Sequence, residues 1–320
     1  MKPHAPLSFA VLVALALSAC SPPQPAEDAG ADTTAPAASA AEADPAYLAS
    51  IEQWREERER KLREPDGWLS FAGSGEIEPG EYRVGAAPDN AIVLAGGPAH
   101  WGVLRLGADG ALRFDAAPDS GLHVDGQPFR SVDLRTQLDE GGPTSVHAGG
   151  QRFYVVKTGE RYGWRFRDPE APGLRAFAGV PHFPVDPSWR IEARWEPFPE
   201  PRAIELVTSN GTVERTESPG LATFERDGRA YSLLPVSQGE DGGLFFVVAD
   251  RSSGRETYGG GRFLDAEAPR DGRVVLDFNK AQNPPCALNG HVVCPLAPPE
   301  NRLDLHVAAG EKTYPLEEHG

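Results

Sequence analysis

Two cysteines and one histidine near the C-terminal end are the first residues of this sequence whose types and spacing could do chemistry. Cys286 and Cys294 have seven residues between them, and His291 lies in that interval. A zinc site lacks a nearby fourth ligand and the usual short ligand spacing. A thiolate nucleophile beside His291 would be converted to a disulfide by the second thiol. A structural disulfide between the two cysteines needs an oxidising compartment. The compartment therefore decides between these three kinds of chemistry.

The N-terminus indicates an exported protein. Lys2 and His4 precede an apolar stretch over residues 9–17, and Leu-Ser-Ala-Cys ends at Cys20. This is the layout of a secretory signal with a small-residue cleavage site, and its apolar part is too short for a permanent membrane helix. Leu-Ser-Ala-Cys resembles the lipobox of bacterial lipoproteins, although an ordinary signal peptide with a chance cysteine is the alternative. The resemblance implies removal of residues 1–19 and a membrane anchor of acyl chains, such as palmitate, on Cys20.

Lipidation of Cys20 would leave Cys286 and Cys294 as an even pair in the oxidising envelope. We predict that they form a disulfide, which closes a loop of nine residues and contributes roughly 2.5 kcal/mol in the chain-entropy model. Ser21 follows the lipidated cysteine, which by analogy with Gram-negative lipoproteins indicates the outer membrane, facing the periplasm.

Polar residues at the ends of two apolar strands are the candidate binding or catalytic site. The candidates are Asp250, Glu256, Tyr258, Arg262, Asp277, Asn279, Asn283 and Asn301. If the two loops meet, a guanidinium could hold an anionic ligand, and Asp277 or Glu256 could act as acid or base. The alternative is that these groups pair with each other and with backbone in a polar network. Known enzyme signatures are absent from the sequence, and we expect neither a metal nor a cofactor.

The remaining pattern predicts a mainly β protein with one N-terminal helix. Residues 20–44 form a lipidated cysteine and a tether without large apolar residues, and an amphipathic helix follows over residues 45–64. Short strands separated by turn residues predict an antiparallel β-sandwich over residues 65–167 and a second antiparallel β-domain over residues 190–320. A proline-rich connector over residues 168–189 separates the two.

Two family resemblances accompany this pattern. Residues 80–157 resemble a forkhead-associated domain, through Arg83-Val84-Gly85, His100 and the corner from Asp119 to Gln127. The phosphate-binding residues of that family do not carry over, since Ala86 stands where arginine is expected.

The runs "FFVVADRSSGRETYGGGRFL" and "VVLDFNKAQNPPCALNGHVVCPLAPPENRL" look like the bacterial family known as domain of unknown function 1684. That family implies a secreted or lipid-anchored β-rich protein and supplies no reaction.

The charge balance excludes one class of partner. The chain of 320 residues has a net charge of −16, which disfavours binding of nucleic acid, and no basic cluster is evident in the sequence.

From these patterns together we expect an envelope lipoprotein that binds a glycan, a peptide or a small anionic ligand through a face formed by Tyr258, Arg262 and Asp277. The alternatives are a hydrolase using Asp277 or Glu256, and a structural or assembly protein of the envelope.

Overall fold

The computed structural model describes residues 44–315, so the signal sequence, Cys20 and the tether lie outside the described residues. Helix α1 (Pro45–Leu62) begins directly after Asp44, whose Oδ1 accepts a hydrogen bond from the amide of Ala46 (2.9 Å). Proline at the first helical position and an aspartate cap together start the helix, as the sequence predicts. Ile51 and Leu62 are buried on its inner face. In the described part of the chain, no helix is both long and apolar enough to cross a bilayer.

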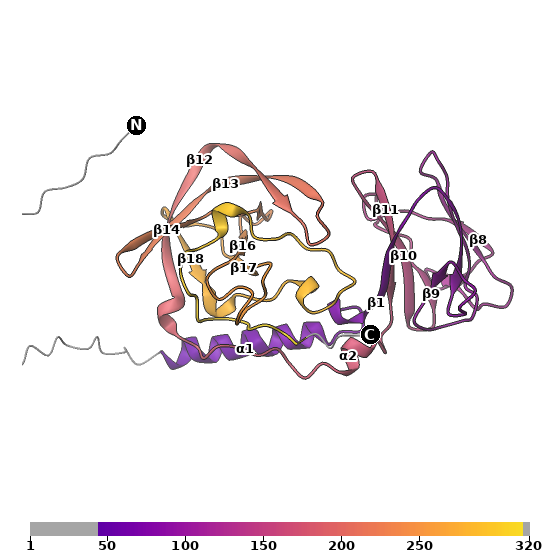
Figure 1. The fold of residues 1–320 in the computed structure, drawn as a ribbon, viewed down its shortest axis with the longest axis horizontal. Coiled ribbons are helices and arrows are strands. Elements are labelled where there is room, and N and C mark those ends of the chain that lie inside the picture. Colours follow the sequence, from indigo (N-terminus) through magenta and orange to yellow (C-terminus); the bar gives the residue numbers. More distant parts are fainter. Residues whose placement is uncertain (1–43, 316–320) are drawn as a thin grey trace, which may run out of the picture. The chain divides into compact units, whose positions relative to one another are not determined.

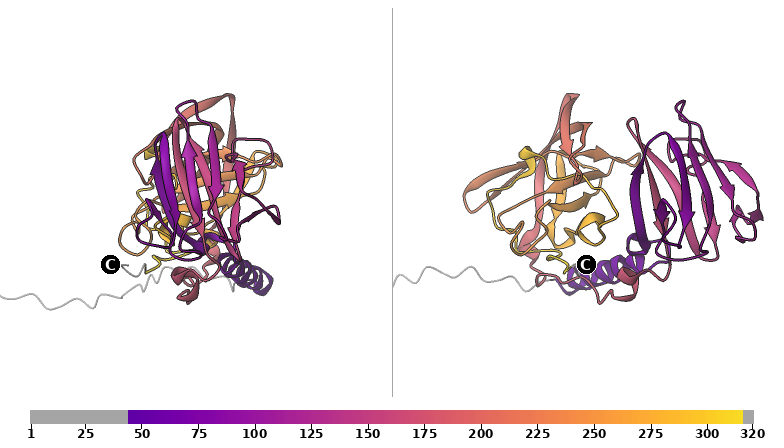
Figure 2. Two further views of the ribbon diagram at one scale, coloured as in Figure 1. Left: turned by 90° about the vertical axis from the view of Figure 1, so that its right-hand side faces the viewer. Right: turned by 45° about the vertical axis from the view of Figure 1, so that its right-hand side comes forward.

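Two antiparallel sheets form the N-terminal sandwich, which we define as residues 71–167 (Figures 1 and 2). The six-stranded sheet has the order β1-β11-β10-β9-β6-β7, and the five-stranded sheet has the order β3-β2-β4-β5-β8. The strands are β1 (Phe71–Ile77), β2 (Gly80–Gly85), β3 (Ile92–Val93), β4 (Gly102–Leu106), β5 (Leu112–Ala116), β6 (His123–Val124), β7 (Gln127–Pro128), β8 (Ser131–Asp133), β9 (Val146–Ala148), β10 (Gln151–Thr158) and β11 (Arg161–Arg167). Leu104 and Phe114 from one sheet pack with Phe153 and Phe166 from the other in a single buried cluster. The two sheets therefore bury their apolar faces against each other.

The second set of strands forms the C-terminal β-region, residues 190–277. A four-stranded sheet has the order β14-β13-β12-β18, and a three-stranded sheet has the order β15-β16-β17. The strands are β12 (Arg190–Val207), β13 (Val213–Arg226), β14 (Arg229–Leu233), β15 (Ser237–Gln238), β16 (Leu244–Val248), β17 (Arg262–Ala266) and β18 (Arg273–Asp277). Asp227 and Gly228 both have positive φ angles (53° and 72°) and join β13 to β14, which confirms the hairpin turn that this pair predicts.

Short helical turns fill the connections. They are η1 (Trp68–Ser70), α2 (Pro172–Arg175), η2 (Pro187–Trp189), η3 (Phe278–Lys280), η4 (Pro285–Ala287) and η5 (Pro299–Asn301). Phe278, Leu303 and Val307 join the core between the two sheets of the C-terminal β-region, so the segment after β18 completes that core. The prediction of a mainly β, antiparallel protein with one long helix is confirmed, with the β2–β3 pair as a parallel exception.

Helix α1 is bonded to the last part of the chain. The hydroxyl of Tyr47 donates to Asp277 (2.9 Å), and Arg58 donates through Nε to Glu311 (3.1 Å). Both contacts lie within one compact unit, Ala43–Gly320. The helix is thus held by side chains more than 200 positions later in the sequence.

Candidate functional site

The predicted candidates come from two runs that do lie side by side. Phe263 and Gln282 exchange both of their backbone hydrogen bonds, at 2.8 and 2.9 Å. The polar side chains nearby are nevertheless largely buried. Arg262 pairs with Asp250 (Nη2 to Oδ2, 3.0 Å) and also donates to the carbonyl oxygens of Val307, Ala309 and Glu311. Its guanidinium is therefore occupied within the protein.

Asp277 and Asn279 are likewise engaged internally. Asp277 Oδ1 accepts from the hydroxyl of Tyr47 (2.9 Å) and from the amide of Asn279 (3.2 Å). The side-chain amide of Asn279 donates to the Tyr47 oxygen (2.9 Å) and to the carbonyl of Asp186 (2.8 Å). Burial, and after it the hydrogen bond to Asp277, raises the pKa of Tyr47 well above its usual value. The phenol is therefore a stable donor that ties α1 to the end of β18.

The side chains of the other two candidate asparagines, Asn283 and Asn301, form hydrogen bonds with backbone groups. The backbone amide of Asn283 donates to the buried carboxylate of Glu311 (2.6 Å), and its side-chain amide donates to the carbonyl of Lys312 (2.8 Å). Asn301 accepts from the amide of Leu234 (2.8 Å) and donates to the carbonyls of Leu234 (2.8 Å) and Val247 (3.1 Å). Both side chains are fully buried, and their amide nitrogens donate to interior carbonyls, whereas Asn283 Oδ1 has no hydrogen-bond partner among the described residues.

Glu256 and Tyr258 have different surroundings. The Glu256 carboxylate is 45% exposed and lies 2.9 Å from Nε2 of His306, which is 47% exposed. Burial, followed by a hydrogen bond with the Cys286 sulfur (3.6 Å), raises the pKa of Tyr258. The structure thus distributes the candidates over separate pairs. In the part of the chain that it describes, no group of three His, Cys, Asp or Glu side chains could hold a metal ion.

Cys286 and Cys294 are buried thiols that touch each other in the structure. The amide of Cys286 donates to the Cys294 sulfur (3.1 Å). A hydrogen bond from the Cys294 thiol lowers the pKa of Cys286 to about 7. The carbonyl and amide of Cys294 bond to Ser209 (2.9 and 3.2 Å), in the turn between β12 and β13. The cysteine loop is therefore fastened to that turn.

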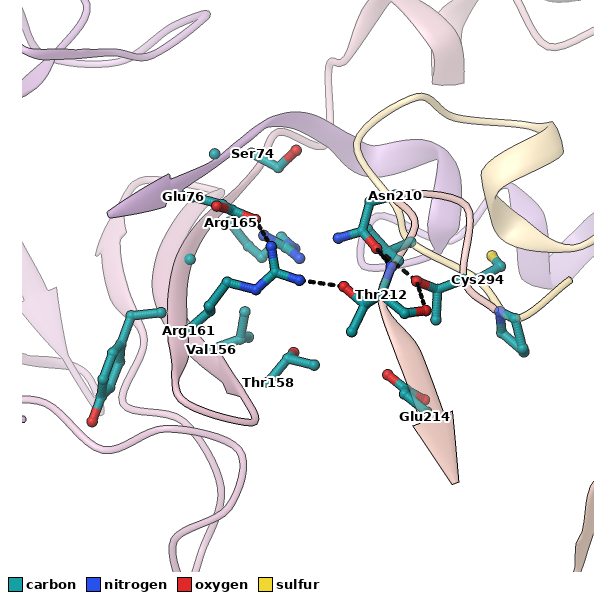
Figure 3. A pocket seen from close by; sticks show the side chains of 16 residues that line it. Ser74, Glu76, Val156, Thr158, Arg161, Arg165, Asn210, Thr212, Glu214 and Cys294 are labelled. Atoms are coloured by element: carbon teal, nitrogen blue, oxygen red, sulfur yellow. Dashed lines mark hydrogen bonds and ion pairs between the residues drawn. The ribbon is translucent and has the colours of Figure 1, made fainter. Parts of the chain in front are cut away.

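An open cleft of about 280 Å³ lies beside this turn, and Figure 3 shows its side chains. One wall consists of the outer face of β1, β10 and β11, and the other consists of the β12–β13 turn with residues 293–295. The polar lining residues are Ser74, Glu76, Thr158, Arg161, Tyr162, Arg165, Thr208, Asn210, Thr212, Glu214 and Cys294. Such a concave polar site is suited to a small ligand.

Arg165 is the cation of this cleft that no acidic residue neutralises. It pairs in register with Ser74 on β1 and with Tyr154 on β10, and its Nη1 donates to the carbonyl of Trp164 (2.9 Å). No carboxylate among residues 44–315 lies within ion-pair distance of it, and burial lowers its pKa. A Cβ at Gly163 would lie 3.2 Å from Arg165 Nη1 and 3.0 Å from the Gly75 carbonyl oxygen. The bare glycine therefore leaves room for the guanidinium to lie across the sheet.

Arg161 and Asn210 complete the polar centre of the cleft. Arg161 pairs with Glu76 (3.1 Å) and also donates to the Thr212 hydroxyl on the opposite wall. Asn210 Oδ1 accepts from the Thr208 hydroxyl (2.6 Å) and the Thr212 amide (3.2 Å), which fixes the direction of its amide nitrogen. That nitrogen has no partner among the described residues. Figure 3 shows Arg161 and Arg165 projecting from one wall and Asn210 standing on the other.

The cleft belongs to a basic surface that the sequence-based analysis missed. Arg152, Arg161, Arg165 and Arg167 lie on one face of the six-stranded sheet, because Arg152 pairs with Arg167 and the other two alternate along β11. The expectation of no basic cluster was therefore wrong. The run "ERYGWRFR" carries the signal, since its three arginines occupy alternate-face positions of the same parity in a strand.

Two residues that carry the forkhead-associated resemblance, Arg83 and His100, are bonded to residues between β2 and β3. His100 Nδ1 lies 3.2 Å from Asn90 Oδ1, and Arg83 donates to the carbonyl of Asp89 (2.6 Å). That resemblance stays a prediction.

Comparison with known proteins identifies one family. Residues 175–312 match the family model described as "Protein of unknown function (DUF1684)". A solution NMR structure of an uncharacterized protein from Haloarcula marismortui is 35% identical, covering 46% of this chain and 83% of that chain, with a TM-score of 0.38. None of the curated proteins matches the chain.

Proposed function

We propose that this chain, which belongs through residues 175–312 to the DUF1684 family of proteins of unknown function, is an envelope-anchored protein that binds a small anionic ligand in the cleft of Figure 3. The observation that carries the proposal is the guanidinium of Arg165, half-buried in the cleft without an acidic partner. A partly desolvated charge without a counter-charge is costly, and a bound oxyanion removes that cost. Arginine is the side chain that best grips carboxylate or phosphate oxygens in a bidentate manner.

The surroundings of Arg165 support an anion in this position. Arg161 lies in the same wall with its charge paired to Glu76, and Asn210 adds an unused amide donor from the opposite wall. The volume of about 280 Å³ lies just below the usual range of about 300 to 1,000 Å³ for ligand pockets. The ligand, or the part of it that enters the cleft, is therefore small.

The hydrolase alternative has less support. Asp277 is bonded to Tyr47 and Asn279, and Glu256 pairs with His306. Neither carboxylate lines the cleft. We therefore place the binding of an anion at Arg165 ahead of acid or base catalysis by these residues.

Export and anchoring are part of the proposal. The lipobox-like sequence ending at Cys20 and the apolar stretch before it support an acylated N-terminus, and residues 21–44 would tether the folded part to the membrane. In that oxidising setting the touching thiols of Cys286 and Cys294 would form the predicted disulfide. The anchor is tested by fractionation: Cys20→Ala should move the protein from the membrane to the soluble fraction. Retention in the membrane would count against acylation.

The binding site is tested by NMR titration of the full-length protein in detergent micelles. The probes are acetate and inorganic phosphate, and the Arg165 Nε–Hε signal should shift with saturable dependence on probe concentration. Arg165→Gln should weaken binding at least tenfold, because an ionic hydrogen bond to the ligand is lost. Arg194→Gln is the matched control, since Arg194 is 73% exposed and lies outside the cleft. Equal affinities of wild type and Arg165→Gln would overturn the proposal.

A further inference from the structure

An apolar groove of about 930 Å³ lies next to the cleft. Alanine, glycine and proline make up ten of its fifteen lining residues, and Phe71, Leu288 and Tyr314 are among the others. No Asp, Glu, Lys or Arg is among the described residues that line it. The side-chain amide of Asn289, which also lines it, donates to the carbonyls of Trp68 (3.3 Å) and Phe71 (2.8 Å). A hollow of this size and lining suits an apolar group.

The groove and the cleft share the two segments that line them. On β1, residues 71–72 line the groove and residues 74–76 line the cleft. In the loop that carries the two cysteines, residues 288–291 line the groove and residues 293–295 line the cleft. The two hollows therefore follow one another along both segments.

Ser74 lies at the boundary between the two hollows, beside the arginine that lacks an acidic partner. Ser74 lines the cleft, and its Oγ is 3.4 Å from Nδ1 of His291, which lines the groove. Ser74 also pairs in register with Arg165 on β11. Because neighbouring strands lie about 4.8 Å apart, the backbone of Arg165 is one strand spacing from this boundary.

The charges of the cleft favour a head group with a single negative charge. Arg161 is paired with Glu76 (3.1 Å), so Arg165 supplies the positive charge that remains. Glu214 lines the cleft from the opposite wall and forms no ion pair among the described residues. It would repel further negative charge on a ligand. A carboxylate therefore suits the cleft better than a phosphate monoester, which carries about −1.5 to −2 at neutral pH.

Resting on the proposed function, we infer that the anionic ligand is a free fatty acid. Its carboxylate is held by Arg165 in the cleft, and its acyl chain runs past Ser74 into the apolar groove. The groove begins at Ala72, two positions from Ser74 on β1 and about 7 Å away along the strand. The first carbons of the chain therefore span the boundary, and the later carbons are buried. Each CH₂ that enters the groove should tighten binding about fourfold.

The test titrates the full-length Cys20→Ala protein, which lacks the acylation site and needs no detergent that would compete for the groove. The probes are butyrate, octanoate, dodecanoate and dodecyl phosphate, each below its micelle-forming concentration. Isothermal titration should show that dodecanoate binds at least tenfold more tightly than octanoate and that butyrate binds more weakly than either. Dodecyl phosphate should bind more weakly than dodecanoate, because Glu214 repels its additional charge.

Two variants separate the binding of the head group from the binding of the chain. Arg165→Gln should weaken butyrate and dodecanoate by the same factor, at least tenfold, because an ionic hydrogen bond to the carboxylate is lost. Ala178→Glu places a charge on an exposed position of the groove. It should weaken dodecanoate at least tenfold and leave butyrate unchanged. The matched control is Ala203→Glu, which should change neither affinity, since Ala203 is also exposed and lines neither hollow.

The outcomes separate this inference from the proposed function. Equal affinities for butyrate and dodecanoate, both weakened by Arg165→Gln, would overturn the fatty-acid inference and leave the anion site in place. Tighter binding of dodecyl phosphate than of dodecanoate, or equal losses of dodecanoate affinity in Ala178→Glu and Ala203→Glu, would do the same. Affinities that Arg165→Gln leaves unchanged, or no binding of any probe, would overturn both the inference and the proposed function.

Discussion

Arg262 and Asp250 form an ion pair whose two side chains are almost completely buried, at 2% and 1% exposure. Asp250 Oδ1 also accepts from the amides of Ser252 (2.8 Å) and Val307 (3.2 Å). The pair thus fastens the loop after β16 to the segment near the C-terminus. Its partners are backbone groups of the protein, which gives it a structural role.

Breaking this pair should destabilise the fold strongly. Asp250→Ala leaves the Arg262 guanidinium buried without a counter-charge, which should lower the free energy of unfolding by about 3–5 kcal/mol. Urea denaturation followed by circular dichroism measures the change. The control is Glu205→Gln, because the Arg215–Glu205 pair is 80% and 63% exposed and is worth less than about 1 kcal/mol. Similar losses for the two variants would contradict the structural role of the buried pair.

Removal of the Tyr47 hydroxyl should change stability at high pH. The folded-state pKa of Tyr47 is raised above its usual value of 10.0, so its contribution is complete below about pH 10 and is lost as the pH rises toward the folded-state value. Wild-type stability should therefore fall above about pH 10, and Tyr47→Phe should show a shallower fall. Urea midpoints between pH 8 and pH 11 test this, and identical slopes for the two proteins would refute it.

Replacing Asn301 by an apolar residue of similar size should lower the stability of the fold. Asn301→Leu leaves the amide and carbonyl of Leu234 and the carbonyl of Val247 without their partners. Each buried group left unsatisfied costs about 1–3 kcal/mol. A thermal melt should show a large drop in Tm, whereas Glu300→Gln, at the exposed neighbouring position, should show almost none.

Cys286 should oxidise readily near neutral pH. Its pKa of about 7 makes the thiolate fraction rise through that pH, so the rate of reaction with oxidised glutathione should rise between about pH 6 and pH 8. Mass spectrometry of non-reduced peptides from protein isolated with the cell envelope should find Cys286 linked to Cys294. Reduction should then lower the free energy of unfolding by roughly 2.5 kcal/mol. Two free thiols in the envelope-isolated protein would rule out the proposed disulfide.

Local signals in the sequence predict the elements of this fold well. Asp44 and Pro45 mark the start of α1, and Asp227-Gly228 marks a hairpin, because the capping and turn preferences of these residues act over a few positions. Alternating apolar residues likewise predict antiparallel strands. These signals do not depend on distant partners.

The candidate site was harder to predict because its charges are balanced by distant residues. Asp277 is bonded to Tyr47, 230 positions earlier, and Arg262 donates to backbone carbonyls 45 to 49 positions later, so groups that look like a binding surface in sequence are internal supports. Conversely, Arg161 reaches Thr212 across 51 positions. A sequence shows which residues carry charge, but the fold decides which charges remain without a partner, as at Arg165.

Helix α1 has a consequence for the order in which the chain folds. It is made early in synthesis, yet Tyr47 and Arg58 gain their partners Asp277 and Glu311 only when nearly the whole chain exists. An isolated helix of 18 residues is marginal in water. The first element of the described chain is therefore among the last to become stable, and a nascent chain that stops before residue 311 lacks part of what holds it in place.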